Sequence, residues 1–313
     1  MLLRRELSLA LFLIGVCLLG QGSLAEPGMT PDADAPIFRK LERIAPYRPY
    51  LERRAQHKTK QIKAGNVGEE SLPELPPGAQ LVTYVSEGRE LQAWLLLPEN
   101  LDEKARPGVV YLHNDFALTE LSYRNALPIV KAGYPVLLPT LRGENGNPGD
   151  FELLYGEVDD AKAAIEWFAN RREVDSDSVY VIGHSIGGGI AALLSLFPEL
   201  PVRLTADVGG IYRARTFTWW STRDSLKDLI RFSPDDKEEV TLRLLGPNIR
   251  DMAHRHISYA GFGSRVDRRY AEDLEKLATT FGAPYELRVV PGGHMSSIRG
   301  AVEDFLGVIQ SNN

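Results

Sequence analysis

Cysteine is almost absent from the 313 residues, since the single one is Cys17, inside an apolar run near the N-terminus. Residues 1–25 have the layout of a secretory signal peptide, with two arginines ahead of the run and small residues, Ser23 and Ala25, at the cleavage site. Cleavage after Ala25 leaves a chain without cysteine, which excludes a disulfide, a cysteine nucleophile and a thiolate metal site. The fold then depends on its hydrophobic core, and the expected location is the bacterial periplasm or exterior.

The N-terminal apolar run is also short. Leu7 to Leu19 falls below the roughly 20 residues that a membrane-spanning helix needs. An uncleaved membrane anchor is the first alternative to the signal peptide. The second is a lipoprotein with a lipid on Cys17, although Val16 is bulky where a small residue is needed. No stable membrane span is expected after signal cleavage.

The sequence lacks an excess of positive charge, with a formal net charge of -6 at pH 7. A nucleic-acid partner is therefore not expected, because such partners select a basic surface. The composition is that of an ordinary globular protein, 43% hydrophobic and 25% charged, which suffices for one large α/β domain.

Residues 26–79 form an irregular N-terminal arm and linker. The arm is rich in proline at its start and then in lysine and arginine, and Gly65 to Gly78 has the composition of a linker. We expect a solvated, partly helical arm that lies on the domain. Contact of the basic stretch with anionic lipid or cell-wall polymer is the alternative.

Residues 80–313 have a regular pattern. Two β-rich runs around Ser86-Glu87-Gly88 indicate a hairpin, and six nearly continuous apolar runs follow, as in strands buried on both faces. The six runs are Gly108 to Leu112, Tyr134 to Pro139, Val179 to Gly183, Leu204 to Gly209, Ile257 to Gly261 and Tyr285 to Val290. Helical spacing of apolar residues occurs over Glu157 to Asn170, Arg268 to Ala278 and Ser297 to Ile309. This alternation predicts an α/β fold, a mostly parallel sheet of about eight strands with helices on both faces and the site at the carboxyl ends of the strands.

One motif carries the chemistry of a nucleophile, Gly183-His184-Ser185-Ile186-Gly187. The G-x-S-x-G pattern alone has low specificity, but here it follows a strand-like run and precedes a small, apolar helix start. A nucleophile elbow requires that setting, because its tight turn needs glycine or a very small residue on both sides of the serine. Ser185 is the expected nucleophile, and the backbone N–H of Ile186 is an expected oxyanion donor. A phosphate-binding loop is the alternative, but the sequence has no Gly-Lys-Ser/Thr.

A serine nucleophile needs a base, and in such a fold the histidine comes last in chain order. Of the six histidines, His294 alone follows the last predicted strand, directly ahead of the final predicted helix. We therefore expect His294 to be the general base; the alternative is a loop histidine without a function. The pair His254-Arg-His256 suggests a metal site, but no carboxylate cluster stands beside it, so we expect surface or core histidines there. No metal or organic cofactor is expected.

Five stretches occur in an order that a known family shares. They are Pro107-Gly-Val-Val-Tyr-Leu-His113, Leu141-Arg-Gly-Glu-Asn-Gly146, Gly156-Glu-Val-Asp-Asp160, Gly183-His-Ser-Ile-Gly-Gly188 and Gly293-His294. From about residue 80 the chain resembles the catalytic domain of the prolyl oligopeptidase family, in particular its acylaminoacyl-peptidase-like and dipeptidyl-aminopeptidase-like branch, without the family's β-propeller. The resemblance implies a Ser-His-Asp hydrolase of the α/β-hydrolase fold that acts on peptides or esters, with Ser185 and His294 as the catalytic pair.

The sequence departs from that family in the turn after the third predicted strand. The family usually has His-Gly-Gly where this chain has His113-Asn114-Asp115-Phe116. We expect the turn to keep its shape with Asn114 at positive φ, because asparagine tolerates that region best among non-glycine residues. The backbone N–H of Asn114 or Phe116 then completes the oxyanion hole. An inward-pointing Asp115 carboxylate would oppose the developing negative charge.

A second departure concerns the acid of the triad. The family has Gly-x-x-Asp after the seventh strand, where this chain has Gly261-Phe-Gly-Ser264, and Asp267 lies three residues further on. We predict Asp267 as the third triad member, because it is the one acidic residue of this loop and it precedes His294. Two alternatives stay open: Asp267 forms a capping box with Ser264, or His294 takes another acid such as Asp207.

Residues 212–256 form a lid-like insertion between the sixth and seventh predicted strands. The insertion contains Arg213, Arg215, Trp219 and Trp220, which either shape substrate choice or pack on the domain. Together these features predict a serine hydrolase that cleaves peptide or carboxylic ester bonds through an acyl-enzyme, with a peptide or small molecule as substrate. The alternative function is a hydrolase fold with weakened catalysis that serves as a binding or scaffold protein, as Ser264 and Asp115 would suggest.

Overall fold

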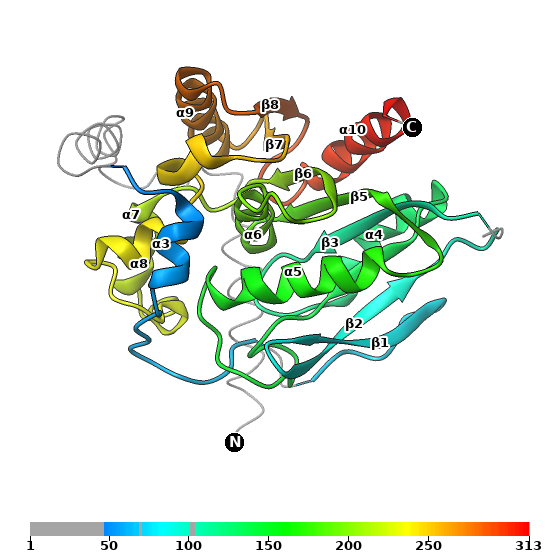
Figure 1. The fold of residues 1–313 in the computed structure, drawn as a ribbon, viewed down its shortest axis with the longest axis horizontal. Coiled ribbons are helices and arrows are strands. Elements are labelled where there is room, and N and C mark those ends of the chain that lie inside the picture. The colour runs from blue at the N-terminus through cyan, green and yellow to red at the C-terminus, as the bar shows by residue number, and fades with distance from the viewer. Residues whose placement is uncertain (1–46, 69–70, 101–103, 313) are drawn as a thin grey trace.

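The computed structural model describes residues 47–68, 71–100 and 104–312, which contain an eight-stranded sheet (Figure 1). The strands are β1 (Ala79–Ser86), β2 (Arg89–Leu96), β3 (Arg106–Leu112), β4 (Val136–Pro139), β5 (Val174–His184), β6 (Val202–Val208), β7 (His256–Gly261) and β8 (Tyr285–Val290). Their order is β1-β2-β4-β3-β5-β6-β7-β8. The pairs β1–β2 and β2–β4 are antiparallel and the other pairs are parallel, so the carboxyl ends of β3 to β8 share one edge.

Helices cover both faces of the sheet (Figure 1). On one face lie α4 (Glu120–Lys131) and α10 (Ile298–Ser311). On the other lie α5 (Gly156–Ala169), α6 (Ile186–Leu194) and α9 (Arg265–Phe281). The sheet is therefore the middle of three layers, as its nearly continuous apolar strands require.

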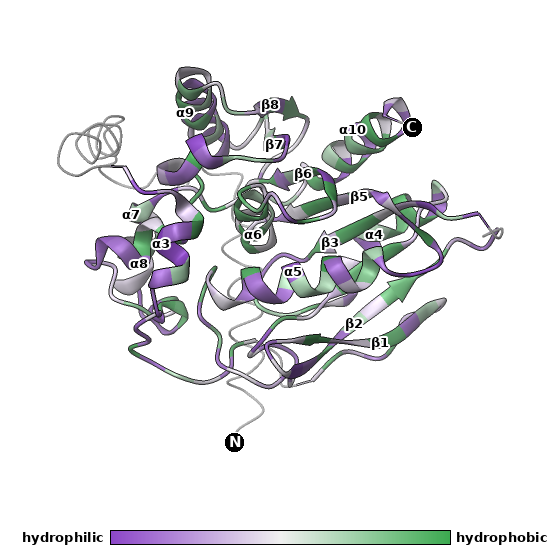
Figure 2. Cartoon of the chain, in the orientation of Figure 1, coloured by the Kyte–Doolittle hydropathy of each residue, from purple (hydrophilic) through white to green (hydrophobic). Residues whose placement is uncertain are grey.

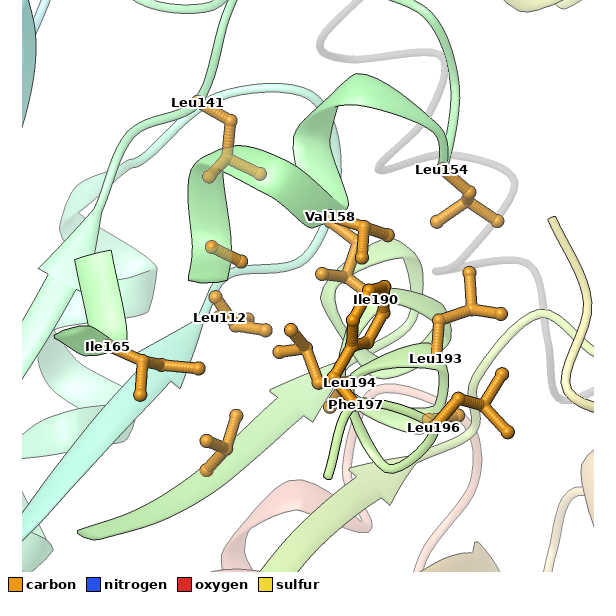
Figure 3. Packing of buried hydrophobic residues seen from close by; sticks show 14 of the residues in the cluster. Leu112, Leu141, Leu154, Val158, Ile165, Ile190, Leu193, Leu194, Leu196 and Phe197 are labelled. Atoms are coloured by element: carbon orange, nitrogen blue, oxygen red, sulfur yellow. The ribbon is translucent and has the colours of Figure 1, made fainter. Parts of the chain in front are cut away.

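Two clusters of buried hydrophobic side chains join these layers. In the first, Leu112 of β3, Val158 of α5 and Ile190 of α6 meet between the sheet and its helices (Figure 3). In the second, Trp94 of β2 and Phe305 of α10 lie in one cluster with residues of α4. Every residue of α6 is buried, and the helix consists of glycine and apolar residues, which appear pale and green in Figure 2. Burial of this helix holds its first residue against the end of β5.

The predicted architecture is confirmed, an α/β fold with a mostly parallel sheet of eight strands and helices on both faces. The six predicted apolar runs coincide with β3 to β8, and the three predicted helices are α5, α9 and α10. The sequence reading missed α4, because Pro128 lies inside that helix and proline normally ends one. At its start, the Thr119 N–H donates to Ser122 Oγ (3.4 Å), a capping signal that the sequence does carry.

The described part of the arm contacts the insertion. Its helix α3 (Tyr50–Gln56) lies beside the short helices of residues 212–256 (Figure 1), and Tyr50 is fully buried. Basic arm side chains pair with acidic insertion side chains: Arg53 with Glu238 (3.3 Å), His57 with Glu239 (2.8 Å), Lys60 with Asp236 (3.0 Å) and Lys63 with Asp228 (2.6 Å). The basic stretch thus binds the chain itself over these residues.

The insertion consists of short helices between β6 and β7. They are α7 (Ala214–Ser221), η1 (Lys227–Leu229), α8 (Lys237–Thr241) and η2 (Gly246–Asp251). Phe217 and Phe232, both fully buried, make a T-shaped contact at 5.2 Å and belong to the same hydrophobic cluster as α5 and α6, so the insertion packs on the domain. The division into an arm over 26–79 and a catalytic domain over 80–313 stays a prediction.

The predicted signal peptide, residues 1–25, lies outside the described residues. Within the described ranges, no helix has both the length and the apolar character that crossing a bilayer requires.

Candidate active site

The residues around Ser185 form a sharp turn between β5 and α6. His184 ends β5 and Ile186 begins α6, so Ser185 alone makes the connection. Its backbone has φ 55° and ψ −111°, a strained combination for a residue with a side chain. The Ser185 N–H donates to the Val208 carbonyl (3.0 Å), which ties the turn to β6. These are the features of a nucleophile elbow.

Backbone atoms occupy the space beside both glycines of the turn. A Cβ atom at Gly183 would fall 2.8 Å from the Gly188 nitrogen, and one at Gly187 would fall 2.5 Å from the His113 carbonyl oxygen. Cβ atoms in proteins essentially never come this close to another heavy atom. The close approach of α6 to β5 and β3 therefore requires glycine at both positions.

His294 lies in the turn between β8 and α10, and its ring bridges the serine and an acid. Its Nε2 lies 3.3 Å from Ser185 Oγ, and its Nδ1 lies 2.9 Å from Asp267 Oδ2. The turn is braced by the Gly293 N–H, which donates to Ser296 Oγ (2.8 Å). The structure thus brings together the three side chains that the sequence predicted, Ser185, His294 and Asp267. They belong to the segments that follow β5, β8 and β7.

Asp267 belongs to the first turn of α9, which orients its carboxylate. Ser264 is the N-cap residue, and its Oγ accepts the Asp267 N–H at 3.5 Å. Because the serine side chain provides the cap, the carboxylate of Asp267 is left to face His294. A capping function of this segment and a contact with His294 therefore coexist. The alternative acid, Asp207, is engaged elsewhere, since it accepts a hydrogen bond from His256 Nε2 (2.8 Å).

Asp267 and His294 shift each other's titration. Burial raises the pKa of Asp267, but the hydrogen bond and charge of His294 outweigh it and leave this pKa below its usual value. Burial lowers the pKa of His294, but the hydrogen bond and charge of Asp267 more than reverse this, so the pKa is raised. Neutral His294 then carries its proton on Nδ1, toward the carboxylate, and presents Nε2 to Ser185 as an acceptor.

His184 is a site residue that sequence reasoning missed as such. Its ring lies 5.3 Å from that of His294, and its Nε2 lies 3.0 Å from the His294 carbonyl oxygen. Burial, and then the charge of His294, lower the pKa of His184 to about 4, so the ring is neutral and donates Nε2–H to that carbonyl. Its place inside the G-x-S-x-G motif was a signal, but the motif does not specify a role for this position.

The turn after β3 differs from the expectation in one respect. Asp115, and not Asn114, takes the positive φ, at 59°. Asn114 is buried instead, and its Nδ2 donates to Asp115 Oδ2 (2.7 Å). Aspartate tolerates this region because its short side chain hydrogen-bonds locally. Asp115 as a residue is exposed, but the surrounding protein desolvates its carboxyl group and raises the pKa of this group. The charges of His113 and His294 act in the opposite direction and do not outweigh the desolvation.

Aromatic side chains border the same turn. The Phe116 ring makes T-shaped contacts with Phe151 (5.7 Å) and with Trp220 of α7 (6.3 Å). Trp220 therefore reaches the turn that lies beside Ser185. Arg213 of the insertion instead pairs with Asp273 of α9 (2.7 Å), which favours a packing role for that residue.

The two histidines at the start of β7 contact protein groups. His256 is fully buried with Asp207 at one ring nitrogen and Thr205 Oγ1 at the other (2.8 Å each). His254 Nε2 lies 2.7 Å from the Phe197 carbonyl oxygen. Among the residues that the structure describes, no three His, Cys, Asp or Glu side chains are grouped to hold a metal ion.

Comparison with protein-family models identifies the family of this chain. The model of the X-Pro dipeptidyl-peptidase (S15) family matches residues 35–220, more than half of the sequence. The chain belongs to this family. Two uncharacterized proteins of Mycobacterium tuberculosis, from strains CDC 1551 / Oshkosh and H37Rv, are each 27% identical to this S15 chain over 161 residues, 49% of it and 55% of theirs. The match thus spans about half the length of these curated relatives.

Solved structures share the fold of this S15 chain. The Pyrococcus horikoshii acylaminoacyl peptidase is 16% identical, with a TM-score of 0.58 over 74% of this chain and 40% of its own. The Mycobacterium tuberculosis puromycin-hydrolyzing peptidase is 16% identical, with a TM-score of 0.64 over 77% and 41%. The Pyrococcus furiosus esterase is 17% identical, with a TM-score of 0.60 over 81% and 97%. Together, family and fold assign the chain to the serine hydrolases and confirm the resemblance to acylaminoacyl- and dipeptidyl-peptidase catalytic domains.

Gly187→Ala tests the close approach of α6 to the sheet. The added methyl group meets the backbone carbonyls at the end of β3, so we expect the free energy of unfolding to fall by about 1–3 kcal/mol. Urea unfolding followed by tryptophan fluorescence measures the change.

Gly307→Ala is the matched control. Gly307 is exposed in α10, and a Cβ atom there would meet no atom within 4 Å. Alanine should raise the stability of this helix by about 0.5–1 kcal/mol. If both alanine variants unfolded at the same urea concentration, the steric account of the turn would be wrong.

Proposed function

We propose that this S15-family chain hydrolyses peptide or carboxylic ester bonds through an acyl-enzyme on Ser185. One observation carries the proposal: His294 has one ring nitrogen 3.3 Å from Ser185 Oγ and the other 2.9 Å from Asp267. A serine hydroxyl is a weak nucleophile near neutral pH, and an adjacent oriented histidine is what activates it. In this proposal Asp267 is the acid of the triad.

Acylation begins with proton transfer from Ser185 to His294 Nε2. As the proton leaves, Oγ bonds to the substrate carbonyl carbon, and the carbonyl electron pair moves to its oxygen. The carboxylate of Asp267 stabilises the imidazolium that forms. Collapse of the tetrahedral intermediate then breaks the bond to the leaving group, and the departing amine or alcohol takes the proton from His294.

Deacylation repeats the steps with water. His294 removes a proton from the water, whose oxygen attacks the acyl carbon, and Ser185 leaves with that proton as the carboxylic acid is released. In both halves the developing oxyanion needs backbone donors. Ile186 supplies one, because the first N–H groups of a helix lack intrahelical partners. The second comes from Asn114 or Phe116, in the turn after β3.

The substrate class follows from the borders of the site. The half-buried ring of Trp220 lies against Phe116 in the turn after β3, the turn that would supply the second oxyanion donor, and an aromatic ring there suits an apolar or aromatic acyl or leaving group. The solved structures that share this fold include proteins named as peptidases and a protein named as an esterase. This supports a peptide or a small carboxylic ester as substrate.

One observation favours a second function. The carboxylate of Asp115 lies in the turn that would bind the oxyanion, close enough to His294 for its charge to contribute to the raised pKa of that ring. An ionised Asp115 directed at the substrate would oppose an oxyanion. The chain would then act as a binding or scaffold protein with weakened catalysis.

A fluorophosphonate probe tests the function, since it needs a working serine–histidine pair and no knowledge of the substrate. We expect one label, on Ser185, located by mass spectrometry of the digested protein. Ser185→Ala should lose both the label and the turnover of aryl esters and aminoacyl anilides. A label on another serine, or full activity of the alanine variant, would overturn the proposal; a folded but unlabelled wild type would favour the binding function.

Asp267→Asn tests the acid of the proposed triad. Removal of the carboxylate leaves His294 in the wrong tautomer, so kcat/KM at neutral pH should fall by roughly 10⁴-fold while the fold persists. The same change removes the interaction that raises the pKa of His294 above its ordinary 6.5. Because the base must be neutral, activity of the wild type should be lost as pH falls through a midpoint above 6.5, and the residual activity of the variant at a lower midpoint.

Ser264→Ala is the control for the helix cap. Loss of the capping hydroxyl should cost about 1 kcal/mol of stability and leave kcat/KM close to that of the wild type. Turnover of Asp267→Asn within a few-fold of the wild type would remove Asp267 from the triad.

The signal-peptide layout of residues 1–25 supports export to the periplasm or the exterior. The exported chain would begin at Glu26. Intact mass of the protein isolated from its native host tests this cleavage. A mass that still includes Met1, or a lipid on Cys17, would contradict it.

A further inference from the structure

A buried polar network lies next to the proposed triad and takes no part in the proposed reaction. Its members are Thr205, Asp207, Tyr212, His256 and Ser258, of which Tyr212 is 3% exposed and the others 0%. We call this group the Asp207 network, because the carboxylate is its centre. One carboxylate oxygen faces His256 (2.8 Å) and the other faces the Tyr212 hydroxyl, which also lies 2.8 Å from Ser258 Oγ.

One end of the Asp207 network holds the backbone directly after β6. The Gly210 N–H donates to Asp207 Oδ1 (2.9 Å) and to the Tyr212 hydroxyl oxygen (3.1 Å). The Tyr212 hydroxyl in turn donates to the same Asp207 oxygen. Gly210 is thereby fixed by two side chains that are themselves joined. The turn 208–210 cannot shift without breaking this group of hydrogen bonds.

The turn 208–210 also supports all three members of the proposed triad. The Val208 carbonyl accepts the Ser185 N–H (3.0 Å). Gly209 packs directly against the acid–base pair: a Cβ atom there would fall 2.8 Å from His294 Nδ1 and 3.1 Å from Asp267 Oδ2. Movement of this turn would therefore displace the nucleophile on one side and the His294–Asp267 pair on the other.

We propose that Asp207 and Tyr212 are positioning residues that hold the turn 208–210 beneath Ser185, His294 and Asp267. They touch no reacting atom and act through the backbone of Gly210. Stability alone is a poor reason for a buried carboxylate, because well-packed apolar residues are often at least as stabilising as a buried ion pair. The kinetic part of this inference rests on the proposed hydrolase function.

Tyr212→Phe and Thr205→Val form a matched pair of variants. Each removes one buried hydroxyl from the Asp207 network with little change in volume and no change in charge. Tyr212→Phe acts at the end that holds Gly210. Thr205→Val acts at the opposite end, where the threonine hydroxyl meets His256 Nδ1 (2.8 Å). Both variants should lose stability in urea, and Tyr212→Phe should lose more, because its hydroxyl contacts Gly210, Asp207 and Ser258 whereas that of Thr205 contacts His256.

We expect the two variants to differ at the proposed triad. Tyr212→Phe should lower kcat about tenfold with little change in KM, because misplaced reacting groups cost rate rather than binding. The pKa of His294, measured by NMR titration of the ¹⁵N-labelled ring, should fall toward its ordinary value as the contact with Asp267 loosens. Thr205→Val should keep both the kcat and the His294 pKa of the wild type. Asp207→Asn should lower kcat further, by roughly 10²-fold.

The inference is overturned if Tyr212→Phe keeps the kcat and the His294 pKa of the wild type. It is also overturned if Thr205→Val changes both quantities as much as Tyr212→Phe does, since that result means a general structural role. The titration of His294 needs no turnover. A wild type that resists the fluorophosphonate would therefore remove the proposed hydrolase function, while the NMR comparison would still decide whether Tyr212 positions the ring.

Discussion

The close contact between the start of α6 and the ends of β3 and β5 is the constraint on which the site depends. It leaves room for glycine alone at Gly183 and Gly187 and forces Ser185 into a backbone conformation of φ 55° and ψ −111°. Strain of this kind costs on the order of 1–3 kcal/mol and persists where the surrounding structure over-determines it. Here a fully buried helix and the hydrogen bond from Ser185 to Val208 supply that surrounding structure.

The parallel sheet converts this local constraint into a site. The segments after β3, β5, β6, β7 and β8 all leave the same edge, so side chains distant in sequence meet there. His294 and Asp267 form a hydrogen bond that orients the ring toward Ser185. The His184 ring donates a hydrogen bond to the His294 carbonyl oxygen and so holds the backbone of His294 in place. The insertion after β6 is held by the arm through ion pairs and reaches the turn after β3 through Trp220. Side chains in the short segments directly after the strands therefore carry the proposed chemistry, and the insertion borders it.

The sequence was most informative where chemistry and local structure coincide. The G-x-S-x-G motif between a strand and a helix pointed to Ser185, and chain order pointed to His294. The sequence was least informative where the pairing of neighbouring strands decides which side chains meet. The carboxylate of Asp207 pairs with His256 and Tyr212 because β6 lies beside β7 with Asp207 opposite Ser258, a register that no local pattern announces. The same applies to the turn after β3, where Asp115 takes the positive φ and Asn114 is buried.

A crystal structure of the protein after reaction with a fluorophosphonate is the sharpest test of acyl transfer at Ser185, because the tetrahedral phosphonyl group resembles the intermediate of that reaction. We expect a bond from Ser185 Oγ to phosphorus. The phosphonyl oxygen should lie about 3 Å from the Ile186 nitrogen and from the nitrogen of Asn114 or Phe116. A phosphonyl oxygen turned toward solvent, or an Asp115 carboxylate in its place, would rule out this oxyanion hole.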